Sequence, residues 1–511
     1  MSPTKTDILS NELWDGIMGF VSRYDLPNIS RVSKHFRDLV KSHLYAEVDL
    51  VKNTHESSAV LKSFLRSIIK NPERGSLVKR ITLGAMYNKL PIGFQPIDKT
   101  FLDEIDVIGL LRQVIDDSDI LVFCVDHYYP SITKERKWDS VVGFLLLLVS
   151  KNLQHLTLHI YDETECSNIN AVVQFLAGFQ PTSSEASIPF DRLSKIELFR
   201  DTRDSDGGTT TVIYQNMFYG RLDQSMLLRQ PCMPFIGLPS VRRVVGGQIN
   251  SIYLERCGPE LAASMPNIKS LELQSCDTTP LVLSRFFDRF PNLERFKWAT
   301  HQLDLIDTHP LAAIGSSVQR LKSSLKEIII NENSRKNEPR LVSLVEFTSL
   351  KTLEIDSFTA LGKAKYVTRP DRPAYLNGPT RYPKEQVEAL IAALPTSLEH
   401  LKITNGPKLE DLVHYVPEIL AAKRKNLVNL KQLTLTGKGR YSQCWVDMEA
   451  AYGMKVAEEE DVKLEYVDTY DGPQEIREIE QRWLLNISVE GFAMTTDLKN
   501  FSQSVLIALG P

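Results

Sequence analysis

The chain has 511 residues, and its 60 lysine or arginine side chains against 64 aspartate or glutamate give a formal net charge of −4. This near balance excludes a bulk electrostatic attraction to nucleic acid or to an anionic membrane, so we expect neither as a partner. The longest apolar run, residues 141–149, is far shorter than the roughly 20 residues that span a bilayer. It predicts a buried helix instead.

The first residues lack the apolar stretch of a secretory signal. The six cysteines include no C-x-x-C pair and no histidine at the spacing of a metal site. We therefore expect an intracellular protein, in the cytoplasm, the nucleus or both. We expect it to have no metal site and no other cofactor.

The first predicted element is a short amphipathic helix that begins after Ser10 or Asn11, either of which can cap it. Its apolar positions recur at helical spacing and form one stripe. The residues of the stripe are Leu9, Leu13, Ile17, Phe20 and Val21.

Two further short helices are predicted between a turn at residues 23–25 and an extended segment at residues 47–50. Apolar residues continue at intervals of three and four, and a bulky pair closes the run: Leu26, Ile29, Val32, Phe36, Leu39, then Leu44 and Tyr45. Three helices this short shield too small a fraction of their surface to be stable alone. Residues 1–50 therefore need a partner or the next domain.

These residues resemble an F-box. The resemblance rests on Leu9 to Leu13, Ile17, the turn before Leu26, Ile29, the run from Val32 to Leu39, and Leu44 with Tyr45. It implies that the segment binds the Skp adaptor of Skp-cullin-F-box ubiquitin ligases and, through it, a cullin. The implied adaptor-binding residues are Leu9, Leu13, Ile17, Phe20, Leu26, Ile29, Val32, Phe36, Leu39, Leu44 and Tyr45. The alternative is that these helices only cap the structure that follows.

One pattern recurs through the rest of the chain: an apolar residue, two of any kind, an apolar residue, one of any kind, and a third apolar residue. It begins at Val78, Leu153, Leu193, Ile249, Ile268, Leu293, Leu325, Leu350, Leu398 and Leu430. The last two apolar residues of each pattern alternate along a short strand and point inward. Helical stretches such as residues 172–176 and 385–391 lie between the patterns, so each unit needs its neighbours to cover it.

This arrangement resembles the leucine-rich-repeat family. The resemblance implies an α/β fold in which an irregular solenoid, with parallel strands inside and helices outside, follows the N-terminal three-helix module. The solenoid is expected over residues 51–485, with insertions at about 84–152, 199–248 and 356–397, and residues 486–511 form a C-terminal cover. Cys257, Cys276 and Asn333 stand where the family often has a structural Cys or Asn after the strand.

No phosphate-binding loop, zinc-protease motif or serine-hydrolase elbow occurs in the sequence. We therefore expect a protein without catalytic residues of its own.

Strand positions that alternate with the buried ones predict an acidic concave surface, which would favour a basic patch on a partner. Its carboxylates are Glu197, Glu255, Glu272, Glu354 and Asp356. The alternative is an ordinary solvated strand face.

A second candidate surface is the insertion over residues 363–384, in which basic residues alternate with tyrosines. Arg369, Arg372, Tyr375 and Arg381 would suit an acidic or phosphorylated segment. The alternative is that the tyrosines pack this loop down over the repeats.

The sequence thus favours a substrate-recognition subunit of a Skp-cullin-F-box ubiquitin ligase, which holds an unknown target protein on its repeats. The alternative is a non-catalytic repeat scaffold with no role in ubiquitination.

Overall fold

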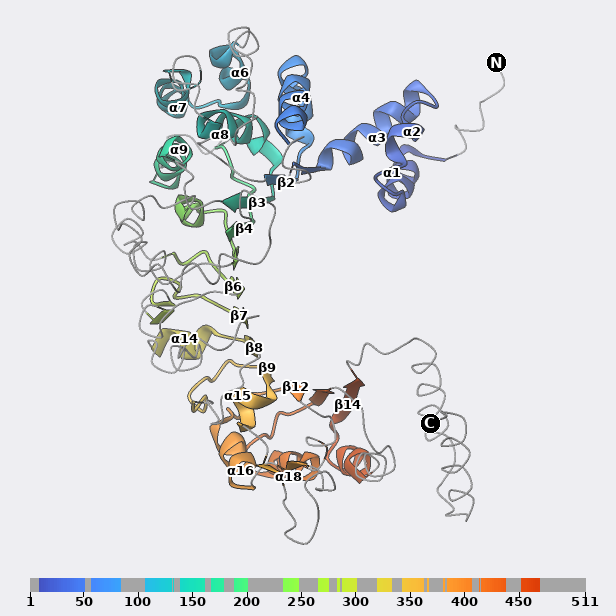
Figure 1. Ribbon diagram of the computed structural model, residues 1–511, viewed down its shortest axis with the longest axis vertical. Helices are drawn as coiled ribbons and strands as arrows, with labels where there is room; N and C mark the ends of the chain where they lie inside the picture. The colour runs from blue at the N-terminus through green and yellow to red at the C-terminus, as the bar shows by residue number, and fades with distance from the viewer. Residues whose placement is uncertain are drawn as a thin grey trace, which may run out of the picture.

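The computed structural model describes residues 9–50, 57–83, 106–130, 132, 138–160, 167–178, 188–200, 233–247, 265–274, 283–284, 287–300, 319–332, 342–362, 365–366, 380–381, 384–406, 413, 415–437 and 452–468. These residues form an arc of repeats with a small helical module at its N-terminal end (Figure 1). The module consists of α1 (Asn11–Phe20), α2 (Leu26–Ile29) and α3 (Lys34–Ala46), so the prediction of three short helices is confirmed.

One parallel sheet runs along the whole arc. Its strand order is the order of the chain, and each strand pairs with its neighbours in register. The strands are β1 (Glu47–Asp49), β2 (Arg80–Leu83), β3 (His155–Ile160), β4 (Lys195–Arg200), β5 (Arg243–Gly247), β6 (Ser270–Gln274), β7 (Arg295–Thr300), β8 (Glu327–Glu332), β9 (Thr352–Asp356), β12 (His400–Gly406), β13 (Gln432–Gly437) and β14 (Lys463–Asp468). A parallel sheet in chain order is what stacked repeats produce, so the predicted solenoid is confirmed.

The helices cover the outer side of the sheet and the strands line the inner side (Figure 1). The helices outside the sheet are α4 (Ser57–Lys70), η2 (Pro72–Leu77), α6 (Val107–Val114), α7 (Ser118–Pro130), α8 (Trp138–Val149), η4 (Ser150–Asn152), α9 (Ser167–Gly178), η6 (Met233–Gly237), α14 (Gln319–Ser324), α15 (Ser357–Leu361), α16 (Lys384–Ala393), α18 (Val416–Ala421) and η8 (Ala422–Arg424). Two further strands, β10 (Lys365–Tyr366) and β11 (Thr380–Arg381), pair with each other in a separate antiparallel sheet. Residues 141–149 are buried in α8, as their apolar run predicted.

The apolar pairs of the recurring pattern form one continuous core between the sheet and the helices. Leu156 and Leu158 of β3, for example, are fully buried, whereas the residues that alternate with them face the inner side of the arc. Burial of a leucine side chain stabilises the fold by roughly 1.5–3 kcal/mol. Repetition of this pair strand after strand therefore supplies most of the cohesion of the arc.

The residue before each strand joins one repeat to the next through its backbone. The carbonyl oxygen of Lys79, for instance, accepts hydrogen bonds from the N–H groups of Gln154 and His155, at 2.8 and 3.1 Å. The same double acceptance recurs at Gln154, Ser194, Arg242, Lys269, Glu294, Lys326, Lys351 and Glu399. The turns that lead into the strands are thus fixed to one another along the arc.

A second link between successive repeats comes from side chains that stand two residues before these carbonyl groups. The sequence pattern did not predict it. Asn152, Asn292 and Asn429 each donate from Nδ2 to a carbonyl oxygen of the preceding repeat, at 2.6, 3.0 and 2.8 Å. Ser240 and Ser397 do the same with their hydroxyl groups. The polar residue just before the first apolar position is therefore part of the repeat.

Strand β5 differs from the sequence-based expectation. It lies within residues 199–248, for which the sequence predicts an insertion, and it pairs directly with β6. The strand predicted from the pattern at Ile249 lies outside the described residues. The pattern at Val241 was missed because its third position is Gly246. Gly247 is required here: a Cβ at this position would lie 2.2 Å from the ring of Phe199 in β4. Cys257, Cys276 and Asn333 lie outside the described residues.

Candidate docking surfaces

Helix α1 has two apolar faces. The inner face carries Trp14, Met18 and Val21, and Met18 forms a small core with Leu26 of α2 and Val40 of α3. The ring of Trp14 meets that of Phe36 edge to face, with centroids 5.0 Å apart. The sequence pattern predicted only the other stripe, because both stripes satisfy helical spacing. It also placed Val21, the residue after the last one of α1, in that stripe, whereas Val21 packs against the inner core.

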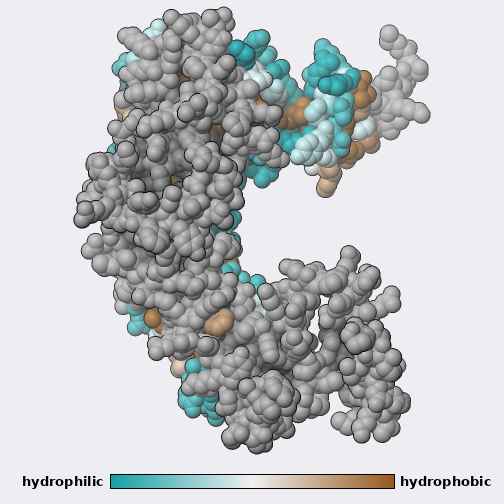
Figure 2. Space-filling view, viewed as in Figure 1, coloured by the Kyte–Doolittle hydropathy of each residue, from teal (hydrophilic) through white to brown (hydrophobic). Residues whose placement is uncertain are grey.

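The module also leaves large apolar side chains in solvent: Leu9, Leu13, Ile17 and Phe20 on or beside α1, and Val32 between α2 and α3. The exposed fractions are 57% for Leu13, 43% for Ile17, 94% for Phe20 and 70% for Val32, and Leu9 is at 36%. Figure 2 shows hydrophobic side chains on the surface of this module. Several large apolar side chains exposed on so small a module favour an interaction site.

Other predicted adaptor-binding residues lie elsewhere in the module. Leu26 is only 3% exposed, and Ile29, Phe36 and Leu44 pack against the same core. Leu26 is therefore corrected from a contact residue to a core residue. Ile29, Phe36 and Leu44 are only partly buried, so their contact with an adaptor stays a prediction. Leu39 is half-buried.

Serine residues begin the two longer helices. The Ser10 hydroxyl accepts a hydrogen bond from the N–H of Leu13 at 3.4 Å, and that of Ser33 accepts from the N–H of Phe36 at 3.1 Å. The expected cap at Ser10 is therefore confirmed. Backbone and Ser10 hydrogen bonds at this helix start lower the pKa of Glu12.

The module joins the arc without a linker, since α3 ends at Ala46 and β1 begins at the next residue. The carbonyl oxygen of Ala46 accepts from the N–H of Lys79 at 2.9 Å. The Tyr45 hydroxyl lies 3.0 Å from Ser67 Oγ in α4, and the Arg74 guanidinium lies 5.4 Å from the centre of the Tyr45 ring. Lys41 and Glu73 form an ion pair across the same joint. Tyr45 therefore fixes the module to the first repeat.

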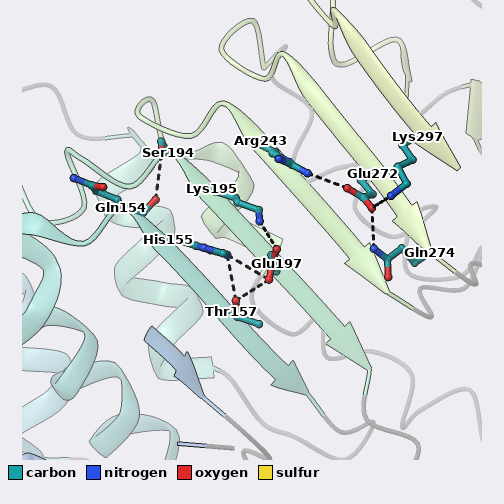
Figure 3. A network of polar contacts seen from close by, with 10 residues as sticks. All are labelled: Gln154, His155, Thr157, Ser194, Lys195, Glu197, Arg243, Glu272, Gln274 and Lys297. Atoms are coloured by element: carbon teal, nitrogen blue, oxygen red, sulfur yellow. Dashed lines mark hydrogen bonds and ion pairs between the residues drawn. The ribbon is translucent and has the colours of Figure 1, made fainter. Parts of the chain in front are cut away.

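The acidic residues of the inner face are paired with bases (Figure 3). Glu197 contacts Lys195 at 2.5 Å, Thr157 at 2.9 Å and His155 at 3.3 Å. Desolvation by itself would raise the pKa of Glu197, but the hydrogen bonds from these three residues outweigh it and lower the pKa to about 2.

Glu272 is held in the same way, by Lys297 at 2.7 Å, Gln274 at 2.9 Å and Arg243 at 3.1 Å, as Figure 3 also shows. Partial burial would raise its pKa, but these hydrogen bonds lower it. Glu354 pairs with Lys402 at 3.2 Å. Bases on the same strand or on neighbouring strands thus neutralise Glu197, Glu272 and Glu354, three of the carboxylates that were predicted to create a negative field.

Asp356 is not on the inner surface at all. It is fully buried, and it caps α15 by accepting hydrogen bonds from the N–H of Thr359 at 2.9 Å and from its hydroxyl at 2.5 Å. Its role as a contact residue is therefore corrected to that of a helix cap. Glu255, Arg369, Arg372 and Tyr375 lie outside the described residues, and Arg381 is described only as part of β11.

Within the described ranges, no group of three His, Cys, Asp or Glu side chains could hold a metal ion. A search of the same part of the chain found no helix that is long and apolar enough to cross a membrane.

Comparison with known families matches residues 7–45 to the F-box domain. The chain therefore carries an F-box domain, and the matched residues coincide with α1, α2 and most of α3. A search of curated proteins found no match.

Proposed function

We propose that this chain is the substrate-recognition subunit of a Skp-cullin-F-box ubiquitin ligase. The observation that carries the proposal is the exposed apolar face of the F-box domain, formed by Leu13, Ile17, Phe20 and Val32. A Skp-family adaptor would cover this face and connect the chain to a cullin. Burial of each of these side chains would contribute roughly 1.5–3 kcal/mol.

In this proposal the chain contributes proximity and other subunits contribute catalysis. A target protein bound along the arc is held near the ubiquitin-loaded enzyme, so transfer becomes effectively intramolecular. The joint around Tyr45 supports this role, because a module fixed to the first repeat limits how far a bound target can move from the adaptor.

The test is adaptor binding by the purified full-length chain, together with co-purification from cells. Leu13→Asp/Ile17→Asp should weaken adaptor binding at least a hundredfold and remove the cullin from the co-purified proteins. Val345→Asp/Val428→Asp is the matched control, since these valines are similarly exposed, at 48% and 53%, but lie on the repeats. Adaptor binding unchanged by the first pair would contradict the assigned face.

A second candidate function is a repeat scaffold that does not take part in ubiquitination. It is favoured if the well-folded wild-type chain binds other proteins but neither an adaptor nor a cullin.

A further inference from the structure

Positive charge is concentrated along one edge of the sheet. We define the basic margin as two residues per repeat from β2 to β14: the residue immediately before each strand and the first residue of the strand. These positions contain eleven lysine or arginine residues and three glutamates, a net formal charge of +8. The basic residues are Lys79, Arg80, Lys195, Arg242, Arg243, Lys269, Arg295, Lys326, Lys351, Lys431 and Lys463, and the glutamates are Glu294, Glu327 and Glu399.

This concentration is local. The third residue of each strand from β2 to β14 also faces the inner side, and this row runs from Thr82 to Glu465. It contains two lysines and four glutamates, a net formal charge of −2. The whole chain has a net charge of −4. Lys195, Arg243 and Lys463 of the margin pair with glutamates of this third position, so these carboxylates balance part of the margin's charge. The two rows together keep a net formal charge of +6, and the positive charge is concentrated at the N-terminal ends of the strands.

The topology makes the margin continuous. Because the strands are parallel and in register, all of their N-terminal ends lie at the same edge. The repeated carbonyl hydrogen bonds fix the backbone of the preceding residues, so successive side chains are spaced by about one strand separation, roughly 4.8 Å.

The three glutamates do not cancel the margin, because they lie deeper than the bases. Glu294 sits between Lys269 at 2.7 Å and Lys326 at 2.8 Å, and Glu399 sits between Lys351 at 2.9 Å and Lys431 at 2.5 Å. Hydrogen bonds from these lysines lower the pKa of both carboxyl groups, that of Glu399 to about 2.

The exposure of the side chains shows the same asymmetry. Glu399 is 19% exposed, whereas Lys351 and Lys431 are 60% and 66% exposed. Each group of two lysines and one glutamate therefore presents two ammonium groups to solvent and keeps a net positive charge.

We propose that the basic margin binds an acidic, extended segment of the target protein, rich in Asp and Glu, which runs across the repeats. The inference rests on the proposed function, and it specifies the chemistry of the target. Ten strand separations of about 4.8 Å correspond to an extended segment of about 14 residues. We assign carboxylates as the ligands because lysines of the margin already bind carboxylates within the protein: those of Glu294 and Glu399, each held by two lysines at 2.5 to 2.9 Å.

The test uses the full-length chain and a fluorescent peptide of about 14 residues in which Glu alternates with Ser. The probe should bind, and its affinity should fall as salt rises from about 0.05 to about 0.3 M. A peptide with Gln in place of Glu should not bind. Lys269→Gln/Lys326→Gln/Lys351→Gln should weaken binding of the Glu peptide roughly tenfold.

The matched control is Lys70→Gln/Lys384→Gln/Lys455→Gln, which removes three exposed lysines outside the margin and should leave affinity within about twofold. The proposal is overturned if the Glu peptide does not bind, or if both triple variants bind it equally. It is also overturned if only a single-stranded oligonucleotide of equal charge binds at the margin, because the margin would then be a nucleic-acid-binding surface.

Adaptor binding by the same preparations separates the two proposals. Peptide binding without adaptor binding would leave the margin in place and contradict the ligase role. Adaptor binding without peptide binding would contradict the margin alone.

Discussion

Ile17 and Met18 are adjacent in α1, yet 43% of Ile17 is exposed and only 3% of Met18. One turn of helix therefore serves two purposes: Met18 holds the F-box domain together, and Ile17 belongs to the surface proposed for the adaptor. Substitutions on the two faces should have separable effects.

On the inner face, Met18→Ala or Val40→Ala should destabilise the domain by about 2–5 kcal/mol, because each leaves a cavity in a core of few residues. Thermal unfolding of the full-length chain, and limited proteolysis of that chain with cleavage followed within residues 9–50, would measure this loss. Phe20→Ala is the control, since Phe20 is 94% exposed: it should leave stability unchanged and weaken adaptor binding. Equal stability of all three variants would contradict the described core.

The joint at Tyr45 should set the orientation of the module. Tyr45→Ala removes the hydrogen bond to Ser67 and the ring beneath Arg74, so the module should move more freely relative to the repeats. Distances between spin labels on exposed Asn28 and Lys151 should become more widely distributed. The control Tyr24→Ala, at a tyrosine that is 81% exposed, should leave the distribution narrow.

Replacement of Glu272 by alanine should lower the stability of the protein more than replacement by glutamine, which removes only the charge. Glu272→Ala leaves Arg243 and Lys297 facing each other beside a partly buried site, and we expect a loss of about 2–4 kcal/mol in the stability of the central repeats. Glu272→Gln keeps a hydrogen-bond acceptor and should cost less. Urea denaturation of the full chain would show the order, and a larger loss for the glutamine variant would contradict the network.

Glu197 should make the stability of the N-terminal repeats depend on pH. Its folded pKa of about 2 lies below the ordinary value of 4.5, so the stabilisation is present above about pH 4.5 and is lost as pH falls toward 2. The free energy of unfolding of the wild type should fall over this pH range. That of Glu197→Gln should be lower at neutral pH and should change less with pH over the same range. Parallel pH profiles would contradict the assignment.

Asp356→Ala should destabilise β9 and α15 by roughly 1–3 kcal/mol. The substitution removes a buried helix cap, the carboxylate that accepts hydrogen bonds from the N–H and the hydroxyl of Thr359. Asp356→Asn retains an oxygen that can cap and should cost less. Hydrogen exchange of the α15 amides would detect the change, and protection equal to the wild type would contradict the capping role.

The sequence alone determined the repeats and the F-box. The repeats and the three N-terminal helices follow from periodicity, because a residue's place on a strand or helix is fixed by local geometry: the apolar pair Leu156 and Leu158, for example, marks one buried strand face. The F-box came from the resemblance of residues 9–45 to that family, which the match over residues 7–45 supports. β5 was missed because Gly246 breaks the apolar pattern, and no local signal shows that Phe199 of the neighbouring strand covers Gly247.

Only the tertiary structure decided which surfaces are available for binding. In α1 both apolar stripes have helical spacing, and only packing against α2 and α3 turns Met18 inward and Ile17 outward. The sequence predicts a negative surface from the inner carboxylates, but the bases that pair with Glu272 and Glu354 lie about 25 to 50 residues away in the chain, on neighbouring strands. Charge on a sheet depends on which residues the register brings side by side, and that register exists only once the repeats have stacked.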